Sequence, residues 1–477
     1  MNRWAWVATL GALLLAGCGG GATGPMPAPV ADDPASTRAT ALPSLQGPIT
    51  GGLRGHALWD SWYDLDALGY VEEEYFVSGT AQSWPEGAAD APYTTRMIVR
   101  RPKDAARFNG TVLLDWVNVT AQFENSVDTL EAHELFHREG YAYVHLSMQA
   151  AGICCLPGLT PKTWDPVRYA PLDHPGDDYA FDMLSQIARR FKQPAAPDAM
   201  AGLKVQRVIA MGQSQSANRL YAYVNEYQRK AAVIDGFLVH SGFSSTYAEP
   251  PQVPVIQLYS DYEADGSSPN GLSNYRGWDI AGAAHQNAWV GLHQVVGQGG
   301  RAAASAPKLP PSADTALHAL AGQYGEQNNP AQYACIVAGA QFPMRYAVAA
   351  AIHHLDRWLR TGQPAPEGPR FQLDVDGALM KDADGNALGG IRLPPISVPI
   401  ASYRSELCGL GGITVPFTAL QLAQRYPTHA DYYCRMLAAS RASQVQGFLL
   451  PEDAADLMAR VEGARNRWLQ AGTRSCE

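Results

Sequence analysis

The sequence is poor in charged residues and has no excess of basic ones. Charged residues make up 17% of the 477 residues and the formal net charge is −9, whereas an average domain is about one quarter charged. An acidic chain of this kind is not expected to bind nucleic acid by general electrostatic attraction. Its hydrophobic share of 46% is ordinary for a globular protein, which excludes global disorder, collagen and a coiled coil.

Long hydrophobic runs and internal repeats are also missing. The apolar run near the N-terminus, Trp4–Gly17, is too short to span a bilayer. Its form is that of an export signal, because Arg3 supplies a positive start and Val7–Leu15 an apolar segment. The following Leu15-Ala16-Gly17-Cys18 resembles the lipobox of bacterial lipoproteins, in which cleavage precedes the cysteine and lipid is attached to its sulfur.

We therefore expect residues 1–17 to be a signal peptide and Cys18 to carry a lipid anchor in a bacterial cell envelope. Residue 19 is glycine and not aspartate, which by the sorting rule of lipoproteins indicates the outer membrane. A plain signal peptide cleaved elsewhere is the alternative. Residues 18–48 are rich in Gly, Pro, Ala and Ser and indicate a flexible tether. Residues 49–477 would form one folded domain, with insertions at about 150–175 and 286–340 and a C-terminal extension.

The chain has no Cys-x-x-Cys pair, which argues against a zinc or thioredoxin-like site. Besides Cys18 it has six cysteines: Cys154, Cys155, Cys335, Cys408, Cys434 and Cys476. An even number in an exported protein indicates up to three disulfides. The adjacent pair at 154 and 155 either bonds to different partners or forms a strained vicinal disulfide. The last three cysteines are expected to staple a C-terminal region that is poor in core strands.

From residue 70 onwards, short apolar runs alternate with segments of helical spacing. The predicted strands are Tyr93–Arg101, Thr111–Trp116, Tyr141–Met148, Val205–Met211, Ile234–Val239, Val253–Tyr259 and Trp278–Ala281. The predicted helices are Val127–Glu139, Asp177–Lys192, Ala217–Arg229 and Tyr346–Leu359. This alternation predicts an α/β fold with a mainly parallel central sheet and helices on both faces. Residues 299–335 indicate an excursion over the surface, and Phe371–Leu393 predicts a β-hairpin around Asp382–Asn386.

The segment most informative for function is Val208–Ala217, in which an apolar strand leads through Gly-Gln-Ser-Gln-Ser into a helix. A nucleophile elbow requires this order, because small residues must flank the serine in a tight turn that lifts its hydroxyl above the sheet. Ser216 stands where the usual motif has glycine, and serine is still small. In the alternative interpretation, Ser214 merely caps the following helix.

The order of residues along the chain supports the elbow. The second predicted strand after Ser214 is followed by Asp261, Glu263 and Asp265, and the next predicted strand is followed by His285. Catalytic groups collect at the carboxyl ends of parallel strands. The α/β-hydrolase fold places its triad in the order serine, acid, histidine.

With these residues in place, the chain resembles the α/β-hydrolase domain family whose elbow reads Gly-x-Ser-Gln-Ser. The blocks that carry the resemblance are Asn109–Val119, Trp164–Tyr169, His174–Asp178, the elbow, Trp278–His285, Gly389–Pro394 and Val398-Pro399. The likeness covers most of residues 50–405. It implies the α/β-hydrolase fold and hydrolysis, without naming a substrate. Neither a cofactor nor a metal is expected.

The resemblance places the nucleophile on Ser214 and the histidine on His285. For the acid, the position after the strand favours Glu263, with Asp261 second and Asp265 third.

Two backbone N–H groups would form the oxyanion hole. One is that of Gln215, directly after the nucleophile, and the other comes from the loop after Thr111–Trp116, near Val117 or Asn118. Each such donor typically stabilises the transition state by about 3 kcal/mol.

Other motifs are weaker candidates for chemistry. The adjacent His353 and His354 project about 100° apart on a helix and cannot easily share a metal. The Asp-x-Asp-x-Asn run at 382–386 lacks the glycine and the closing glutamate of a calcium loop, so we expect a turn. His145 and His240 are expected to be buried strand histidines.

We therefore predict a serine hydrolase of the carboxylesterase type, which cleaves a small-molecule ester through an acyl-enzyme. It would be exported and anchored to the membrane by lipid. The alternatives are a non-catalytic surface-binding protein that retains the fold, and an acyltransferase that uses the same triad. Neither the acyl and alcohol parts of the substrate nor the oligomeric state follows from the sequence.

Overall fold

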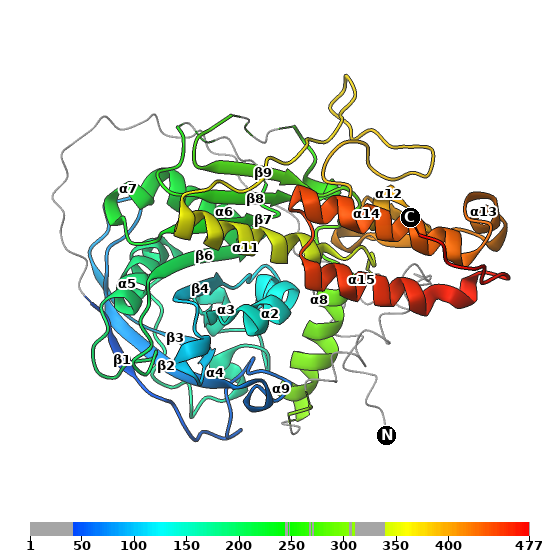
Figure 1. Cartoon of the computed structure of the whole chain (residues 1–477). Helices are drawn as coiled ribbons and strands as arrows, with labels where there is room; N and C mark the ends of the chain where they lie inside the picture. The colour runs from blue at the N-terminus through cyan, green and yellow to red at the C-terminus, as the bar shows by residue number, and fades with distance from the viewer. Residues whose placement is uncertain are drawn as a thin grey trace.

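The computed structural model describes residues 42–476 apart from 244–246, 248, 267–268, 270, 305–307 and 311–338. Cys18, Cys335 and most of the predicted excursion at 299–335 lie outside the described residues. Within them, a nine-stranded sheet runs through the molecule in the order β1-β2-β3-β5-β4-β6-β7-β8-β9 (Figure 1). Its strands are β1 (Ser44–Gln46), β2 (Tyr70–Ala81), β3 (Ala91–Pro102), β4 (Thr111–Trp116), β5 (Ala142–Leu146), β6 (Arg207–Gln213), β7 (Gly236–His240), β8 (Val255–Tyr259) and β9 (Tyr275–Asp279).

The sheet confirms the predicted mainly parallel α/β architecture. The six strands from β5 to β9 in the sheet order pair in parallel, and β1, β2 and β3 extend the sheet with antiparallel pairs. The carboxyl ends of the six parallel strands therefore meet at one edge. The loops that follow β4, β6, β8 and β9 carry the predicted site residues to this edge.

Helices cover both faces of the sheet. They are α2 (Val127–Glu139), α3 (Ala150–Ile153), α4 (Pro161–Trp164), α5 (Ala180–Lys192), α6 (Gln215–Ala222), α7 (Gln228–Ala231), α8 (Ala288–Leu292), α9 (Gly300–Ala304) and α11 (Met344–Thr361). Because successive strand residues point to opposite faces, Leu113 packs with α2 and α11, whereas Val112 and Leu114 pack with α5 and α6. The helix predicted at 217–229 starts two residues earlier and continues as a π-helix, η4 (Tyr223–Tyr227).

The sequence pattern did not predict strand β2, although it is twelve residues long. Its run Glu72-Glu73-Glu74 suggests an exposed polar segment. In the structure, arginines of the paired strand β3 neutralise all three acids: Arg100 bonds to Glu72, Arg101 to Glu73 and Arg96 to Glu74. Glu72 lies directly opposite Arg100, and the other two pairs are diagonal. Ion pairs between the two strands therefore stabilise the charged part of β2.

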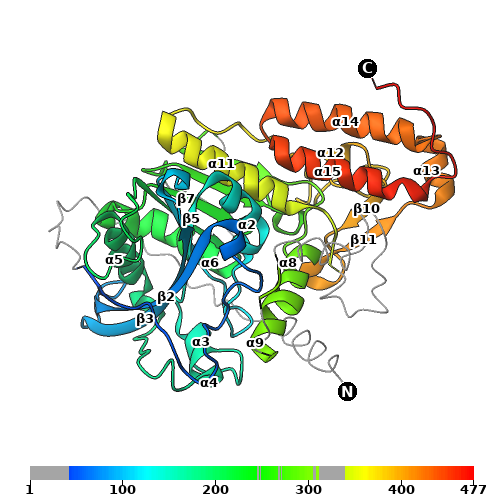
Figure 2. The ribbon, with the colours of Figure 1, turned by 60° about the horizontal axis from the view of Figure 1, so that its bottom comes forward.

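The C-terminal extension is mostly helical. It contains α12 (Pro394–Ser397), α13 (Ala419–Arg425), α14 (His429–Gln446), α15 (Pro451–Gly463) and a hairpin of β10 (Ala401–Arg404) and β11 (Ile413–Pro416). Figure 2 shows α14 and α15 beside α11, at one side of the sheet. Buried residues of α14 and α15, such as Met436 and Leu457, belong to the same hydrophobic cluster as α11.

One predicted boundary needs correction. The tether cannot extend to residue 48, because Ser44–Gln46 already pairs with β2 as strand β1. The hairpin predicted over Phe371–Leu393 takes the form of isolated antiparallel bridges, such as that of Lys381 with Ala387, and not of regular strands. The Asp382 side chain accepts the N–H groups of Asp384 and Asn386, so local hydrogen bonds build this turn in place of a ladder.

The cysteines of the described residues are cross-linked. Cys154 and Cys155 form the vicinal disulfide, and Cys434 is bonded to Cys476 across the C-terminal helices. Cys408 is also in a disulfide. Among the helices that the structure describes, none combines the length and the apolar character needed to cross a membrane.

Candidate active site

Ser214 lies at the apex of a strained turn between β6 and α6. Its backbone angles are φ 60° and ψ −118°, a left-handed conformation that a side chain other than glycine rarely adopts. Two hydrogen bonds hold the turn, from the Ser214 N–H to the His240 carbonyl (2.8 Å) and from the Asn218 N–H to the Ser214 carbonyl (3.0 Å). A Cβ atom on Gly212 would lie 3.0 Å from the Cβ of Ser216, so glycine at the first position of the motif lets strand and helix approach without a tight contact.

The hydroxyl of Ser214 is hydrogen-bonded to a histidine and, through it, to a carboxylate. Ser214 Oγ lies 2.8 Å from His285 Nε2, and His285 Nδ1 is bonded to Glu263 Oε1. All three side chains are largely buried, with Ser214 8% and His285 4% exposed. The structure thus brings together three residues that are 22 and 71 positions away from one another along the chain.

A local motif holds Glu263 in place. It ends the short 3-10 helix η5 (Asp261–Glu263), and its Oε2 accepts hydrogen bonds from the N–H (2.8 Å) and the hydroxyl (2.6 Å) of Ser260. Burial would raise the pKa of Glu263, but the neighbouring His285 and the bonds from Ser260 outweigh it and lower that pKa. The carboxylate is therefore ionised and aimed at the imidazole.

Asp261, the second candidate for the acid, points elsewhere. Its Oδ1 accepts the N–H of Gly282 at 2.9 Å and so ties the loop after β8 to the loop after β9. Burial raises the pKa of Asp261 to about 8. Its hydrogen bond thus links two loops, whereas the carboxylate bonded to His285 is that of Glu263.

The predicted oxyanion donors are only partly available. Gln215 starts α6, directly after the nucleophile, where its N–H is not yet needed within the helix. Both donor groups of Asn118 are already hydrogen-bonded. Its N–H donates to the Asn125 carbonyl (2.9 Å), and its side-chain amide donates to the Gln213 carbonyl (3.1 Å). We therefore discard Asn118 as a donor, and Val117 is the candidate that the loop after β4 retains.

Gln213 is a site residue that sequence reasoning missed. Its side-chain amide donates to the carbonyl of His285 at 2.9 Å, while its own carbonyl accepts the amide of Asn118. It directly precedes Ser214, so this buried side chain joins the elbow, the histidine loop and the loop after β4. Its position in the Gly-Gln-Ser run gave no sign of this role, because both partners are distant in sequence.

Buried acids lie beneath the elbow on helix α2. Asp128 is bonded to the imidazole of His240 (2.8 Å), whose carbonyl holds the Ser214 N–H. Glu131 accepts the amide of Asn287 at 2.6 Å, two residues after His285. Burial raises the pKa of Glu131 to about 7. The histidine loop is thus fixed to α2.

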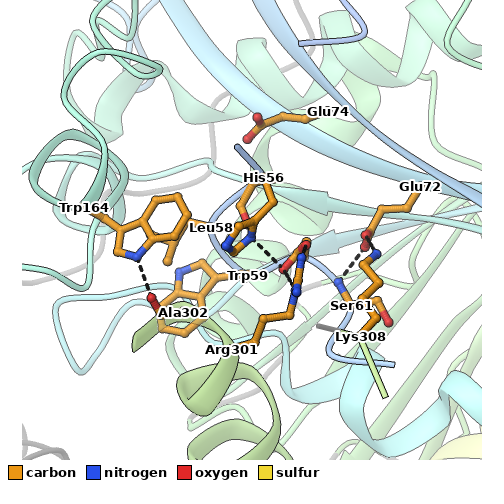
Figure 3. A network of polar contacts seen from close by, with 12 residues as sticks. His56, Leu58, Trp59, Ser61, Glu72, Glu74, Trp164, Arg301, Ala302 and Lys308 are labelled. Atoms are coloured by element: carbon orange, nitrogen blue, oxygen red, sulfur yellow. Dashed lines mark hydrogen bonds and ion pairs between the residues drawn. The ribbon is translucent and has the colours of Figure 1, made fainter. Parts of the chain in front are cut away.

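Further contacts fasten the segment that follows α8 to the N-terminal loop of the domain (Figure 3). Arg301 forms an ion pair with Asp60 (2.5 Å), and Lys308 forms one with Glu72 (2.6 Å). The indole of Trp164 donates to the carbonyl of Ala302 at 2.9 Å. These contacts attach Arg301, Ala302 and Lys308 to the N-terminal segment of the domain, to α4 and to β2.

Comparison with known proteins agrees with this geometry. The chain matches the family described as alpha/beta hydrolase domain over residues 45–459, and it belongs to that family. A hydrolase activity is what this family membership supports. No curated protein matches the chain. Among the described residues, no cluster of three or more His, Cys, Asp or Glu side chains could hold a metal ion.

Solved structures of hydrolases share short parts of the fold. A putative dienelactone hydrolase from Klebsiella pneumoniae is 15% identical, with 41% of this chain and 75% of that chain covered and a TM-score of 0.22. Esterases from the fungus Rhizomucor miehei are represented at 11% identity, 45% and 75% coverage and a TM-score of 0.28. An esterase from Pyrococcus furiosus shows 11% identity, 46% and 85% coverage and a TM-score of 0.26. We draw no functional conclusion from similarity at this level.

Proposed function

We propose that the protein is a serine hydrolase that cleaves carboxylic esters, with Ser214, His285 and Glu263 as its triad. The observation that carries the proposal is the continuous hydrogen-bonded path from the Ser214 hydroxyl to the Glu263 carboxylate. Ser214 itself lies at the carboxyl edge of the parallel strands, on a left-handed turn that leads into a helix. A serine that only capped α6 would need neither the histidine nor the strained backbone.

In this mechanism, Ser214 Oγ attacks the ester carbonyl while His285 Nε2 accepts its proton. Glu263 holds the imidazole by Nδ1 and stabilises the imidazolium. The negative charge that develops on the carbonyl oxygen is bound by the N–H groups of Gln215 and Val117. His285 then gives its proton to the alcohol oxygen as the carbon–oxygen bond breaks. Water, deprotonated by the same histidine, releases the acid from the acyl-enzyme.

Acylation of the serine tests the proposal directly. The full-length protein is mixed with p-nitrophenyl acetate, and the release of p-nitrophenol is followed. A quenched sample is then digested, and its peptides are analysed by mass spectrometry. We expect a rapid first turnover and an acetyl group on the peptide that contains Ser214. The Ser214→Ala variant should show neither. If the protein is never acylated and turns over no short-chain ester, it is a binding protein with a hydrolase fold.

We also propose that Cys18 is lipidated and holds the domain at the bacterial outer membrane. The support is the Leu15-Ala16-Gly17-Cys18 motif after an apolar segment. In the host, Cys18→Ser should move the protein from the membrane fraction to the soluble exported fraction. Unchanged fractionation would exclude lipid at this cysteine.

A further inference from the structure

Two aromatic side chains flank the imidazole of His285. The ring of Phe243 stacks on it, with 5.5 Å between the ring centroids and 23° between the planes. The ring of Tyr262 lies 5.7 Å away at 58°, and the two aromatic rings meet edge to face at 6.1 Å. Phe243 belongs to the loop after β7, and Tyr262 belongs to η5 after β8.

Both rings face solvent, which is unusual in this molecule. Phe243 is 43% and Tyr262 41% exposed. Among the described residues, the other large hydrophobic side chains with this exposure are aliphatic. The exposed aromatic rings are therefore those of Phe243 and Tyr262, and both contact His285. Exposed aromatic surface costs free energy in water, and where it gathers at a site it marks a binding surface for apolar groups.

The sheet order separates the two halves of a bound ester. The elbow follows β6, and the donor candidate Val117 follows β4, on one side of β6. Phe243, Tyr262 and His285 follow β7, β8 and β9, on the other side. The carbonyl oxygen is therefore drawn towards the β4 side. The alcohol oxygen must reach His285 Nε2 to receive its proton, so the alcohol part lies on the side of the two rings.

We propose that Phe243 and Tyr262 form the binding site for the alcohol part of the substrate, and that this part carries a flat aromatic group. The inference rests on the proposed function and narrows it to carboxylic esters of aromatic alcohols. Stacking against each ring is expected to favour such an ester over an aliphatic one by about three- to tenfold.

Two matched pairs of esters test the inference. Benzyl acetate and ethyl acetate differ only in the alcohol, and neither has an activated leaving group. Methyl phenylacetate and methyl propionate place the same contrast in the acyl part. We expect the ratio of kcat/KM for benzyl over ethyl acetate to be about tenfold or more, and the ratio for the acyl pair to be clearly smaller. A larger ratio for the acyl pair would overturn the assignment.

Variants separate binding from support of the histidine. Phe243→Ala and Tyr262→Ala should each lower the benzyl-to-ethyl ratio by about three- to tenfold, whereas Tyr262→Phe should keep it. Leu420→Ala, at an exposed side chain on the remote α13, should change neither ester. If both esters lose activity equally in the alanine variants, the rings only support His285 and the inference is wrong. If Ser214 is acylated by no ester, the proposed function fails and this inference fails with it.

Discussion

Within the part of the chain that the structure describes, two Ser–His–Glu groupings can be compared, and they differ in their surroundings. In the first, Ser214 Oγ lies 2.8 Å from His285 Nε2, and Nδ1 is bonded to Glu263. In the second, Ser126 Oγ lies 2.7 Å from Nδ1 of His145, whose Nε2 is 3.0 Å from Glu124. The residue types and distances are nearly the same. Composition and spacing alone therefore do not distinguish a catalytic group from a structural one.

The two groupings differ in backbone and in access. Ser214 sits on a left-handed turn beside two exposed aromatic rings, whereas Ser126 has an ordinary φ of −88° where it precedes α2. Ser126 is 2% exposed and His145 is completely buried. Ser214 is 8% exposed, so the first serine keeps more contact with solvent than the second.

The two glutamates also differ in their partners. Glu263 is bonded to His285 and to Ser260, with no arginine in the group. Glu124 is paired with the buried Arg96, which itself also pairs with Glu74. Burial, which outweighs the neighbouring Glu124, lowers the pKa of His145. A histidine in this setting is a poor base, and the second grouping is a buried ion network that holds strands β2 and β3 to the loop after β4.

Removing the two serines should give the largest contrast. Ser214→Ala should lower kcat for p-nitrophenyl acetate by about 10⁴-fold or more, because no acyl-enzyme can form, and should leave the fold intact. Ser126→Ala should keep kcat within a few-fold and lower the free energy of unfolding by about 1–3 kcal/mol, because buried His145 loses its partner. Steady-state kinetics of both variants measure kcat, and urea denaturation measures the free energy of unfolding. Equal losses of kcat would contradict the comparison.

Changing the two glutamates should give the next largest contrast. Glu263→Gln should lower kcat by about 10³- to 10⁴-fold, since the amide cannot hold and stabilise the imidazolium. Glu124→Gln should instead cost about 3 kcal/mol of stability, because Arg96 loses a buried carboxylate. Asp261→Asn is the control for the acid, with kcat close to that of the unchanged protein. A larger loss of kcat in Asp261→Asn than in Glu263→Gln would reverse our assignment.

Two buried glutamines offer a finer test. Gln213 donates to the carbonyl of His285 and Gln228 to the carbonyl of Ile234, both at 2.9 Å. Gln213→Met should lower kcat about 10- to 100-fold with little change in KM, because a small displacement of a general base such as that proposed for His285 is costly. Gln228→Met should affect stability alone. If the two variants have the same kcat, Gln213 does not position the site.

The last prediction concerns stability and not turnover, through the dependence of Asp261→Asn on pH. The native carboxyl, with a pKa of about 8, holds a proton that the unfolded chain releases near its usual pKa of 3.8. The native protein therefore loses stability as the pH rises from about 4 to 8, at up to about 1.4 kcal/mol for each pKa unit. Asparagine cannot ionise, so the variant should gain stability relative to the unchanged protein between pH 5 and pH 8. Denaturation curves at both values should reveal this gain, and a constant difference would contradict the assigned pKa.

Sequence reasoning agrees with the structure where the signal is local. The strand, the Gly-x-Ser-x-Ser turn and the helix are contiguous, so the sharp turn at Ser214 could be placed to the residue, while its role as a nucleophile stays a prediction. The choice of Glu263 over Asp261 had a local signal too, because Ser260 and Glu263 form a capping box, with serine followed three positions later by glutamate. That pattern fixes the direction of the glutamate side chain.

Sequence reasoning failed where the interaction partners of a residue come from distant segments of the chain. The acids of β2 are satisfied by arginines of β3, so its charge pattern did not indicate a strand. The N–H of Asn118 is occupied by Asn125 through the fold of the loop itself. The roles of Gln213 and Phe243 depend on the position of His285 in the fold, and the spacing of residues along the chain does not predict that position.

Labelling with a fluorophosphonate tests the central claim most directly, because only a serine activated by a neighbouring base reacts quickly. The full-length protein is labelled for a short time, digested, and the modified serine identified by mass spectrometry. The account predicts one label per molecule on Ser214, no label on Ser126, and a loss of labelling in His285→Ala but not in His145→Ala variants that remain folded. A label on Ser126, or none on Ser214 in the folded protein, would contradict it.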